Sequence, residues 1–180
     1  MAKKGQYTYA YPHPAVTADS VVFGYDDQAL KVLLIRRGKE KDATMTACVG
    51  EWALPGGFLE VDKDKTIAHT AARELKEETG LKLAVKAFRE VGSYSDIKRD
   101  PRERVITIAH YALVKLTEVE AHSDADKAEW FSLTDVPHLA FDHDTILRDA
   151  LARMKQDIYF DKAYSDQPCY RLCRLLAVSK

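Results

Sequence analysis

Residues Gly56 to Leu81 of this 180-residue chain read GGFLEVDKDKTIAHTAARELKEETGL. Apolar residues recur at helical spacing through the middle of the stretch, at Ile67, Ala68, Ala71, Ala72 and Leu75. This period predicts a helix from about Thr66 to Thr79 with one face in the core. Gly80 follows where a left-handed C-cap favours glycine. We therefore expect a turn at Gly56-Gly57, a loop over Phe58–Lys65 and then a capped helix.

Three acids lie on one side of the predicted helix. Glu77 and Glu78 follow Glu74 by three and four residues, and a turn of about 100° per residue places all three on one face. Like charges at this spacing cost about 0.2–0.5 kcal/mol per pair. A solvated acidic surface is the simpler interpretation of this pattern alone. The functional interpretation is a platform for Mg²⁺ or Mn²⁺, which prefer oxygen ligands, and the flanking residues favour it.

The stretch resembles the Nudix box of hydrolases that act on nucleoside diphosphates linked to another group. The box reads G-x5-E-x7-R-E-U-x-E-E-x-G-U, where U is aliphatic; Gly57 matches its start and Arg73–Leu81 match its second half. The resemblance implies that Glu74 and Glu78 are the principal metal ligands, that Glu77 is a further one, and that the Gly57 carbonyl lies close by. It also implies that Arg73 braces the acids through ion pairs. A plain surface salt bridge is the alternative for Arg73.

The loop half of the box departs from the pattern. The distance from Gly57 to Arg73 is two residues too long, and the first glutamate of the box falls on Lys65. The resemblance implies that this missing acid pairs with the box arginine. Asp64 is our first choice as the substitute, ahead of the other loop acids, Glu60 and Asp62. Because it lies next to the helix start, Asp64 can equally be an N-cap. Since the helical half is intact, we expect an active enzyme.

The rest of the chain predicts an α+β fold. β-Branched and apolar residues predict strands at Ala15–Phe23, Leu30–Arg37, Arg104–Leu116 and Lys127–Leu133, with one or two more in Leu83–Tyr94. An amphipathic helix with apolar positions from Ile146 to Ile158 closes the fold, with Asp142 as its cap. This order predicts a mixed β-sheet with helices packed on it, and the Nudix resemblance implies an α/β/α sandwich.

Domain organisation and composition are simple. We expect one Nudix domain over residues 1–160, containing a surface loop at Gly38–Gly50, and a C-terminal tail over residues 161–180. With 31% charged residues and a net charge of −1, the chain has no overall attraction to nucleic acid or membranes. The sequence has no signal peptide or membrane span, so we expect a cytoplasmic protein. Cys169 and Cys173 are expected to be ordinary thiols rather than a zinc site.

The flanks of the box resemble one Nudix branch. They read TYAYPHPAVTADSVVF, GSYSDIKRDPRERVITIAHYALV and EWFSLTDVPHLAFDHDTILRDAL. That branch holds ADP-ribose pyrophosphatases and the sensor domains of Nudix-related transcriptional regulators. We predict that Arg99, Arg102 and Arg104 grip a phosphate or the terminal ribose through charge-assisted bonds, and that Tyr94 stacks on adenine. A solvated hairpin tip is the alternative. Trp52 is expected in the core.

The function that these patterns favour is metal-dependent hydrolysis of a pyrophosphate bond, with ADP-ribose cut to AMP and ribose 5-phosphate. Mg²⁺ or Mn²⁺ is the implied cofactor, a small nucleotide the implied partner, and a homodimer the implied assembly. The rival hypothesis is a non-catalytic sensor of ADP-ribose or a nucleotide sugar. Residues 161–180 are too few for the winged helix-turn-helix of the related regulators, which argues against a DNA-binding regulator. A general base is not identified, although Glu118, Glu120 and Asp124 lie in a suitable loop.

Overall fold

The computed structural model describes residues 9–26, 28–38, 47–122 and 125–160. The elements follow one another along the chain as β1 (Ala15–Tyr25), β2 (Leu30–Arg37), β3 (Trp52–Ala53), β4 (Gly56–Phe58), α1 (Ile67–Thr79), the 3₁₀ turn η1 (Val85–Ala87), β5 (Arg89–Tyr94), β6 (Val105–Lys115), β7 (Ala125–Ser132) and α2 (His143–Phe160).

Several predictions concern residues outside the described ranges. They are the greater part of the surface loop, at 39–46, the candidate base Asp124, and the tail 161–180 with its thiols Cys169 and Cys173. These stay predictions.

The sheet is arranged around β1 and β6, the two longest strands. They run parallel, with partners from Ala15↔Val105 to Tyr25↔Lys115, and every other pair of named strands is antiparallel. The main strand order is β3-β2-β1-β6-β5, with β7 beside β2. The C-terminal end of β1 pairs with β2, whereas Thr17–Asp19 pair with β4. The sheet is therefore mixed, as predicted.

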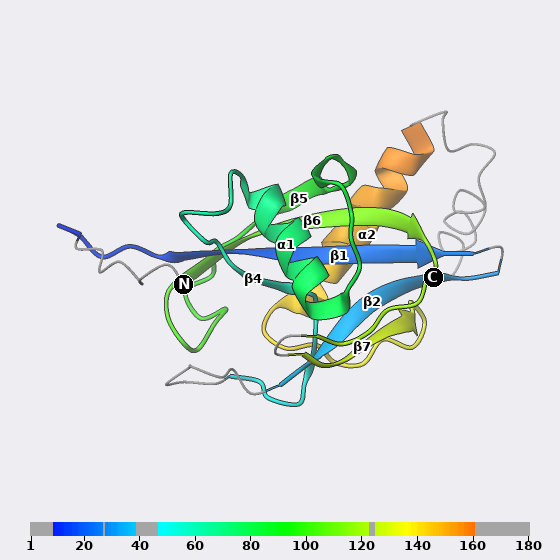
Figure 1. The fold of residues 1–180 in the computed structure, drawn as a ribbon, viewed down its shortest axis with the longest axis horizontal. Helices are drawn as coiled ribbons and strands as arrows, with labels where there is room; N and C mark the ends of the chain where they lie inside the picture. Colours follow the sequence, from blue (N-terminus) through cyan, green and yellow to red (C-terminus); the bar gives the residue numbers. More distant parts are fainter. Residues whose placement is uncertain (1–8, 27, 39–46, 123–124, 161–180) are drawn as a thin grey trace.

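Helices cover the two faces of the sheet, with α1 in front and α2 behind in Figure 1. The faces follow from the alternation of side chains along β1. Val21 and Phe23 share a core with Met154 of α2, whereas Val22 shares a second core with Leu75 of α1. A strand buried on both faces is apolar almost throughout. The predicted α/β/α sandwich is confirmed.

Helix α1 begins and ends at the capping residues that the sequence predicted. Thr66 is the N-cap, and its side chain accepts a hydrogen bond from the His69 N–H at 3.3 Å. Gly80 ends the helix with φ at +71°, and its N–H bonds to the Lys76 carbonyl. The glycine pair before the helix differs from expectation, because Gly56–Phe58 form strand β4 on the edge of β1 rather than a turn.

Other boundaries shift modestly. The first strand continues to Tyr25, and Leu83–Tyr94 contain one strand, β5, preceded by η1. Trp52 is partly buried and packs against the core, with its ring 4.6 Å from that of Phe131. Asp142 immediately precedes α2, but its carboxylate binds the guanidinium of Arg99 rather than capping the helix.

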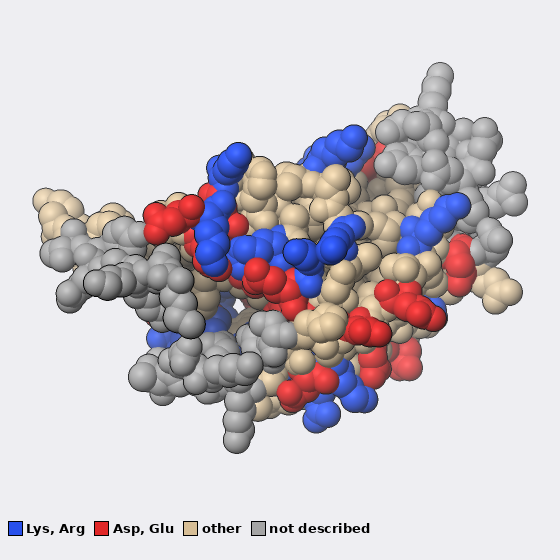
Figure 2. Space-filling model, viewed as in Figure 1, with Lys and Arg blue, Asp and Glu red and all other residues tan. Residues whose placement is uncertain are grey.

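The molecular surface shows no broad field of one charge on the face that carries α1. Basic and acidic side chains lie side by side there (Figure 2). Neither α1, α2 nor any other helix in the described ranges combines the length and hydropathy needed to cross a membrane.

Candidate active site

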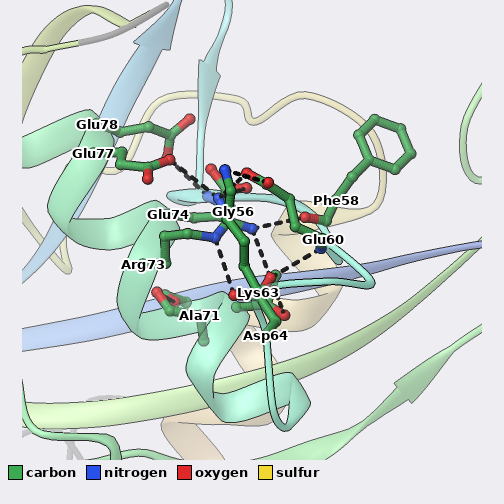
Figure 3. A network of polar contacts seen from close by, with 12 residues as sticks. Gly56, Phe58, Glu60, Lys63, Asp64, Ala71, Arg73, Glu74, Glu77 and Glu78 are labelled. Carbon is green, nitrogen blue, oxygen red and sulfur yellow. Dashed lines mark hydrogen bonds and ion pairs between the residues drawn. The ribbon is translucent and has the colours of Figure 1, made fainter. Parts of the chain in front are cut away.

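The acidic face of α1 lies against the two glycines of β4. Glu78 is only 4% exposed, and its Oε2 accepts a hydrogen bond of 2.9 Å from the Gly56 N–H. Glu74 approaches the next residue, Gly57, so closely that a Cβ there would lie 2.5 Å from the Glu74 Cδ. Glycine is therefore needed at position 57 for close approach to Glu74, and at position 56 for close approach to Ala18 and Asp19 of β1. Figure 3 shows these side chains around Gly56.

Arg73 connects the acidic face to the preceding loop. Its Nη1 donates to Glu74 Oε1 at 2.7 Å and to Glu77 Oε2 at 3.1 Å. Its Nη2 donates to the Phe58 carbonyl at 2.9 Å. Burial lowers the pKa of Arg73, but its bonds to Asp64 and Glu74 outweigh that effect and raise it well above the usual value. The side chain is only 16% exposed, so the ion pairs predicted for Arg73 are present and are not a plain surface bridge.

Asp64 is the acid that pairs with the box arginine in place of the missing glutamate. Its two carboxylate oxygens accept from Arg73 Nε at 3.1 Å and Nη2 at 2.8 Å, in a bidentate pair. The Thr70 hydroxyl and the Glu60 N–H also donate to it. Because Thr66 is the N-cap, the capping alternative for Asp64 is wrong. Lys65, which occupies the position of the family's glutamate, is exposed.

This pairing sets the acid stability of the loop. The hydrogen bonds from Arg73 lower the pKa of Asp64 from 3.8 to about 2. A lowered folded-state pKa contributes stability above pH 4 that is lost as the pH falls toward 2, here about 2 kcal/mol. We expect Asp64→Asn to lower the free energy of unfolding at pH 7 by about that amount and to flatten its fall between pH 4 and 2. Urea titrations across that range measure both quantities.

Asp135→Asn is the control, because Asp135 is an exposed acid outside this loop. It should preserve the wild-type dependence on pH. If Asp64→Asn loses stability between pH 4 and 2 as steeply as wild type, Asp64 is not the partner that Arg73 stabilises.

The donor set fits a hard divalent cation in its chemistry. Glu74, Glu77 and Glu78 supply only oxygen ligands, which Mg²⁺ and Mn²⁺ prefer, and two of them reach the backbone of β4. Among the described residues, no three histidine, cysteine or acidic side chains converge closely enough to hold an ion as they stand. In this arrangement Glu74 and Glu77 bind Arg73, and Glu78 binds the Gly56 N–H.

The four residues predicted to bind substrate divide into two groups. Arg102 lies beside the box, with its guanidinium 5.2 Å from the ring centroid of Phe58 and bound to Asp100. Arg104 is exposed just before β6. Arg99 and Tyr94 instead point toward α2. The guanidinium of Arg99 is 4% exposed. Substrate binding by these residues stays a prediction.

Tyr94 is tied to α2 by its hydroxyl, which donates to Asp149 Oδ2 at 2.9 Å. Burial, reinforced by that bond, raises the pKa of Tyr94 above its usual value.

The loop that carries Glu118 and Glu120 reaches the C-terminal end of α1, where the Glu120 N–H donates to the Thr79 carbonyl at 3.2 Å. The backbone of Glu120 thus contacts the C-terminal end of the acidic helix.

Three residues near the site had no predicted role. Asp19 lies on β1 next to β4, His143 begins α2, and Phe141 has a left-handed backbone with φ at +58°. A signal for Asp19 was available, because it is the one charged residue of β1, and a buried charge requires a partner. His143 and Phe141 belong to a stretch that predicted only helix capping.

An acidic helix that follows a glycine pair within an α/β/α sandwich is the arrangement that the Nudix resemblance implied. Comparison with known proteins agrees. Residues 13–154 match the family model described as NUDIX domain. The match covers most of the chain, which therefore belongs to the Nudix family.

The relatives include an enzyme and a regulator. The chain is 42% identical over 139 residues to the ADP-ribose pyrophosphatase of Methanocaldococcus jannaschii, covering 77% of this chain and 74% of that protein. It is 33% identical over 147 residues to the ADPR responsive transcriptional repressor NtrR of Acinetobacter baylyi, where it covers 80% of this chain but only 56% of the repressor.

A solved structure supports the fold and the branch. The Nudix domain of Shewanella oneidensis NrtR, crystallised with ADP ribose, superposes with a TM-score of 0.72 at 30% identity. The superposition covers 81% of this chain and 91% of that one.

Proposed function

We propose that this protein is a Nudix hydrolase that cleaves the pyrophosphate bond of ADP-ribose and releases AMP and ribose 5-phosphate. The observation that carries the proposal is the acidic face of α1 set on β4, with Glu78 bound to the Gly56 N–H and Glu74 against Gly57. The 42% identical pyrophosphatase supports ADP-ribose as the substrate.

The platform is proposed to hold Mg²⁺ or Mn²⁺ through Glu74 and Glu78, with Glu77 as a further ligand and the Gly57 carbonyl nearby. Such an ion neutralises phosphate charge and lowers the pKa of a bound water. The chain's own residues keep the carboxylates in place. Arg73 gathers Glu74 and Glu77, and the Gly56 N–H orients one oxygen of the buried Glu78.

Substrate phosphates are proposed to meet Arg102 and Arg104, and adenine to stack near Tyr94. Arg102 has the best support, because its guanidinium stacks on Phe58, the residue that follows Gly57. The guanidinium places positive charge beside the box, while its Nε and Nη2 donate to the buried Asp100. For Arg99 the contacts with Asp142 and Asp19 favour another role. A homodimer, implied by the family resemblance, is also proposed.

A non-catalytic ADP-ribose sensor is the second candidate, favoured by the related repressor. The site supports hydrolysis over it. The second half of the box is intact from Arg73 to Leu81, and Asp64 supplies the acid that the loop otherwise lacks. A sensor has no need of a complete set of carboxylates.

Purified protein incubated with Mg²⁺, Mn²⁺ or EDTA and a panel of substrates separates these candidates. The panel contains ADP-ribose, NADH, sugar nucleotides and nucleoside triphosphates. We expect AMP and ribose 5-phosphate from ADP-ribose, no product in EDTA, and recovery of the rate on adding either ion. Tight binding of ADP-ribose by calorimetry without turnover in either metal would contradict hydrolysis and support the sensor.

A further inference from the structure

A buried ion cluster lies between the 95–104 loop, β1 and the start of α2. Arg99 donates from Nε and Nη2 to the two oxygens of Asp142, at 2.9 and 2.7 Å. Its Nη2 also lies 3.5 Å from Asp19 Oδ2. The side chains of Arg99 and Asp19 are 4% and 9% exposed. One buried guanidinium therefore neutralises the buried Asp19 and the partly exposed Asp142, and an unpaired charge in a buried place costs several kcal/mol.

His143 extends this cluster toward the strand before the box. Its Nδ1 accepts a hydrogen bond of 3.0 Å from the Leu54 N–H, so the neutral ring carries its hydrogen on Nε2. That nitrogen faces Asp19 Oδ2 at 3.7 Å. Burial lowers the pKa of His143 below its usual value, which preserves Nδ1 as an acceptor.

The cluster touches the chain immediately before the metal platform. Asp19 is the sheet partner of Gly56, and a Cβ on Gly56 would lie 2.5 Å from Asp19 Oδ1. The Ser20 N–H binds the Pro55 carbonyl at 2.8 Å. Residues Leu54–Gly56 are thus held on one side by His143, Asp19 and Ser20, and on the other by Glu78.

The backbone next to these contacts is strained at Phe141. Phe141, adjacent to Asp142, has φ at +58°, a conformation that a bulky residue adopts only when its surroundings impose it. The pair of Asp142 with Arg99 and the bond of His143 to Leu54 anchor the chain directly after Phe141. The 95–104 loop and the start of α2 are therefore fastened together and to Leu54.

We propose that Arg99 is a positioning residue that holds Leu54–Gly56 against the acidic face of α1, acting through Asp142, Asp19 and His143. This role rests on the proposed function, since what Arg99 positions is the proposed metal platform. It differs from direct binding of substrate, because Nε and Nη2 of this buried guanidinium already donate to Asp142, and Nη2 also lies 3.5 Å from Asp19. A lysine cannot reproduce it, since one ammonium does not offer the paired donors of the guanidinium.

Amide hydrogen exchange at Leu54 and Gly56, followed by NMR, tests the positioning without substrate or metal. We expect Arg99→Met to speed exchange at both amides about tenfold or more, and Arg99→Lys to speed it less but measurably. The amide of Leu113 in β6 serves as an internal reference and should change little. Arg148→Met is the matched control, because Arg148 is exposed on α2. Its guanidinium donates to Thr145, three residues earlier in the same helix.

Steady-state kinetics with ADP-ribose supply the second readout. Residues that support a metal site from outside it typically contribute about 10–100-fold, so we expect kcat to fall by about that factor in Arg99→Met. KM should stay within about threefold of wild type, since substrate contacts are retained. A rise in KM at unchanged kcat, with wild-type exchange at Leu54 and Gly56, would overturn the proposal and make Arg99 a substrate ligand.

The two readouts separate this proposal from the proposed function. If wild-type protein hydrolyses no ADP-ribose, the proposed function fails, and the exchange rates still decide whether Arg99 positions the segment. If Arg99→Met does not fold, Arg99→Lys decides the question, because it keeps the buried positive charge. If Arg99→Lys has wild-type amide exchange at Leu54 and Gly56 and a wild-type kcat, the positioning does not need a guanidinium, and the proposal is refuted.

Discussion

Glu78→Gln is expected to lower kcat for ADP-ribose by about 10²–10³-fold in Mg²⁺, with no loss of the folded structure. A metal ligand contributes several kcal/mol to stabilising charge in the transition state, and each 1.4 kcal/mol or so is worth about tenfold in rate. The glutamine amide keeps the shape of the side chain, and its oxygen still accepts from the Gly56 N–H. What is lost is the negative charge of a carboxylate that is only 4% exposed.

Product formation and thermal unfolding should be measured on the same preparations of this variant. Glu103→Gln is the matched control, since Glu103 is an exposed glutamate outside the site, and it should keep wild-type activity. A Glu78→Gln protein that hydrolyses ADP-ribose at the wild-type rate would remove Glu78 from the proposed set of metal ligands.

Arg73→Met is expected to lower the free energy of unfolding by about 3–5 kcal/mol, the usual cost of removing one partner from a buried ion pair. The reason is the charge left behind. Asp64 is 4% exposed and Glu74 15%, and both lose their cation. Methionine fills much of the same volume, so little of the effect comes from packing. Urea denaturation at pH 7 measures the loss, and activity should fall with it.

Arg89→Met is the control for this substitution. Arg89 is 49% exposed and lies 3.8 Å from Asp157, and an exposed pair of this kind contributes about 0–1 kcal/mol. Adding Asp64→Asn to Arg73→Met should cost less than the two single losses together, because the second substitution removes the charge that the first leaves unpaired. Full additivity would contradict the coupling between Arg73 and Asp64.

Sequence patterns within a short segment were sufficient to predict the features that depend only on neighbouring residues along the chain. The apolar period, Thr66 and Gly80 predicted α1 to within one residue. The β-branched runs predicted the long strands, and their order predicted the mixed sheet. The spacing of Glu74, Glu77 and Glu78 placed three acids on one face, because helix geometry alone determines it.

Side-chain partners distant in sequence could not be predicted in this way. The lengthened loop left Asp64 open as a cap or a partner of Arg73, since the choice depends on the path of the loop in space. Arg99 read as an exposed phosphate ligand because a loop before a strand is usually solvated. Its buried position depends on β1, which supplies Asp19, and on the residue before α2, Asp142, both far away in the chain.

The sequence by itself determined the family, the acidic helix, its caps and the strands that surround it, since each rests on a local period or a motif. Only the tertiary structure decided which acid pairs with Arg73, that Gly56 and Gly57 form an edge strand, and that Arg99 faces inward. The physical reason is that these choices depend on which segments the sheet brings together. The pairing of β4 with β1 puts Asp19 beside Gly56, and no spacing along the chain encodes that contact.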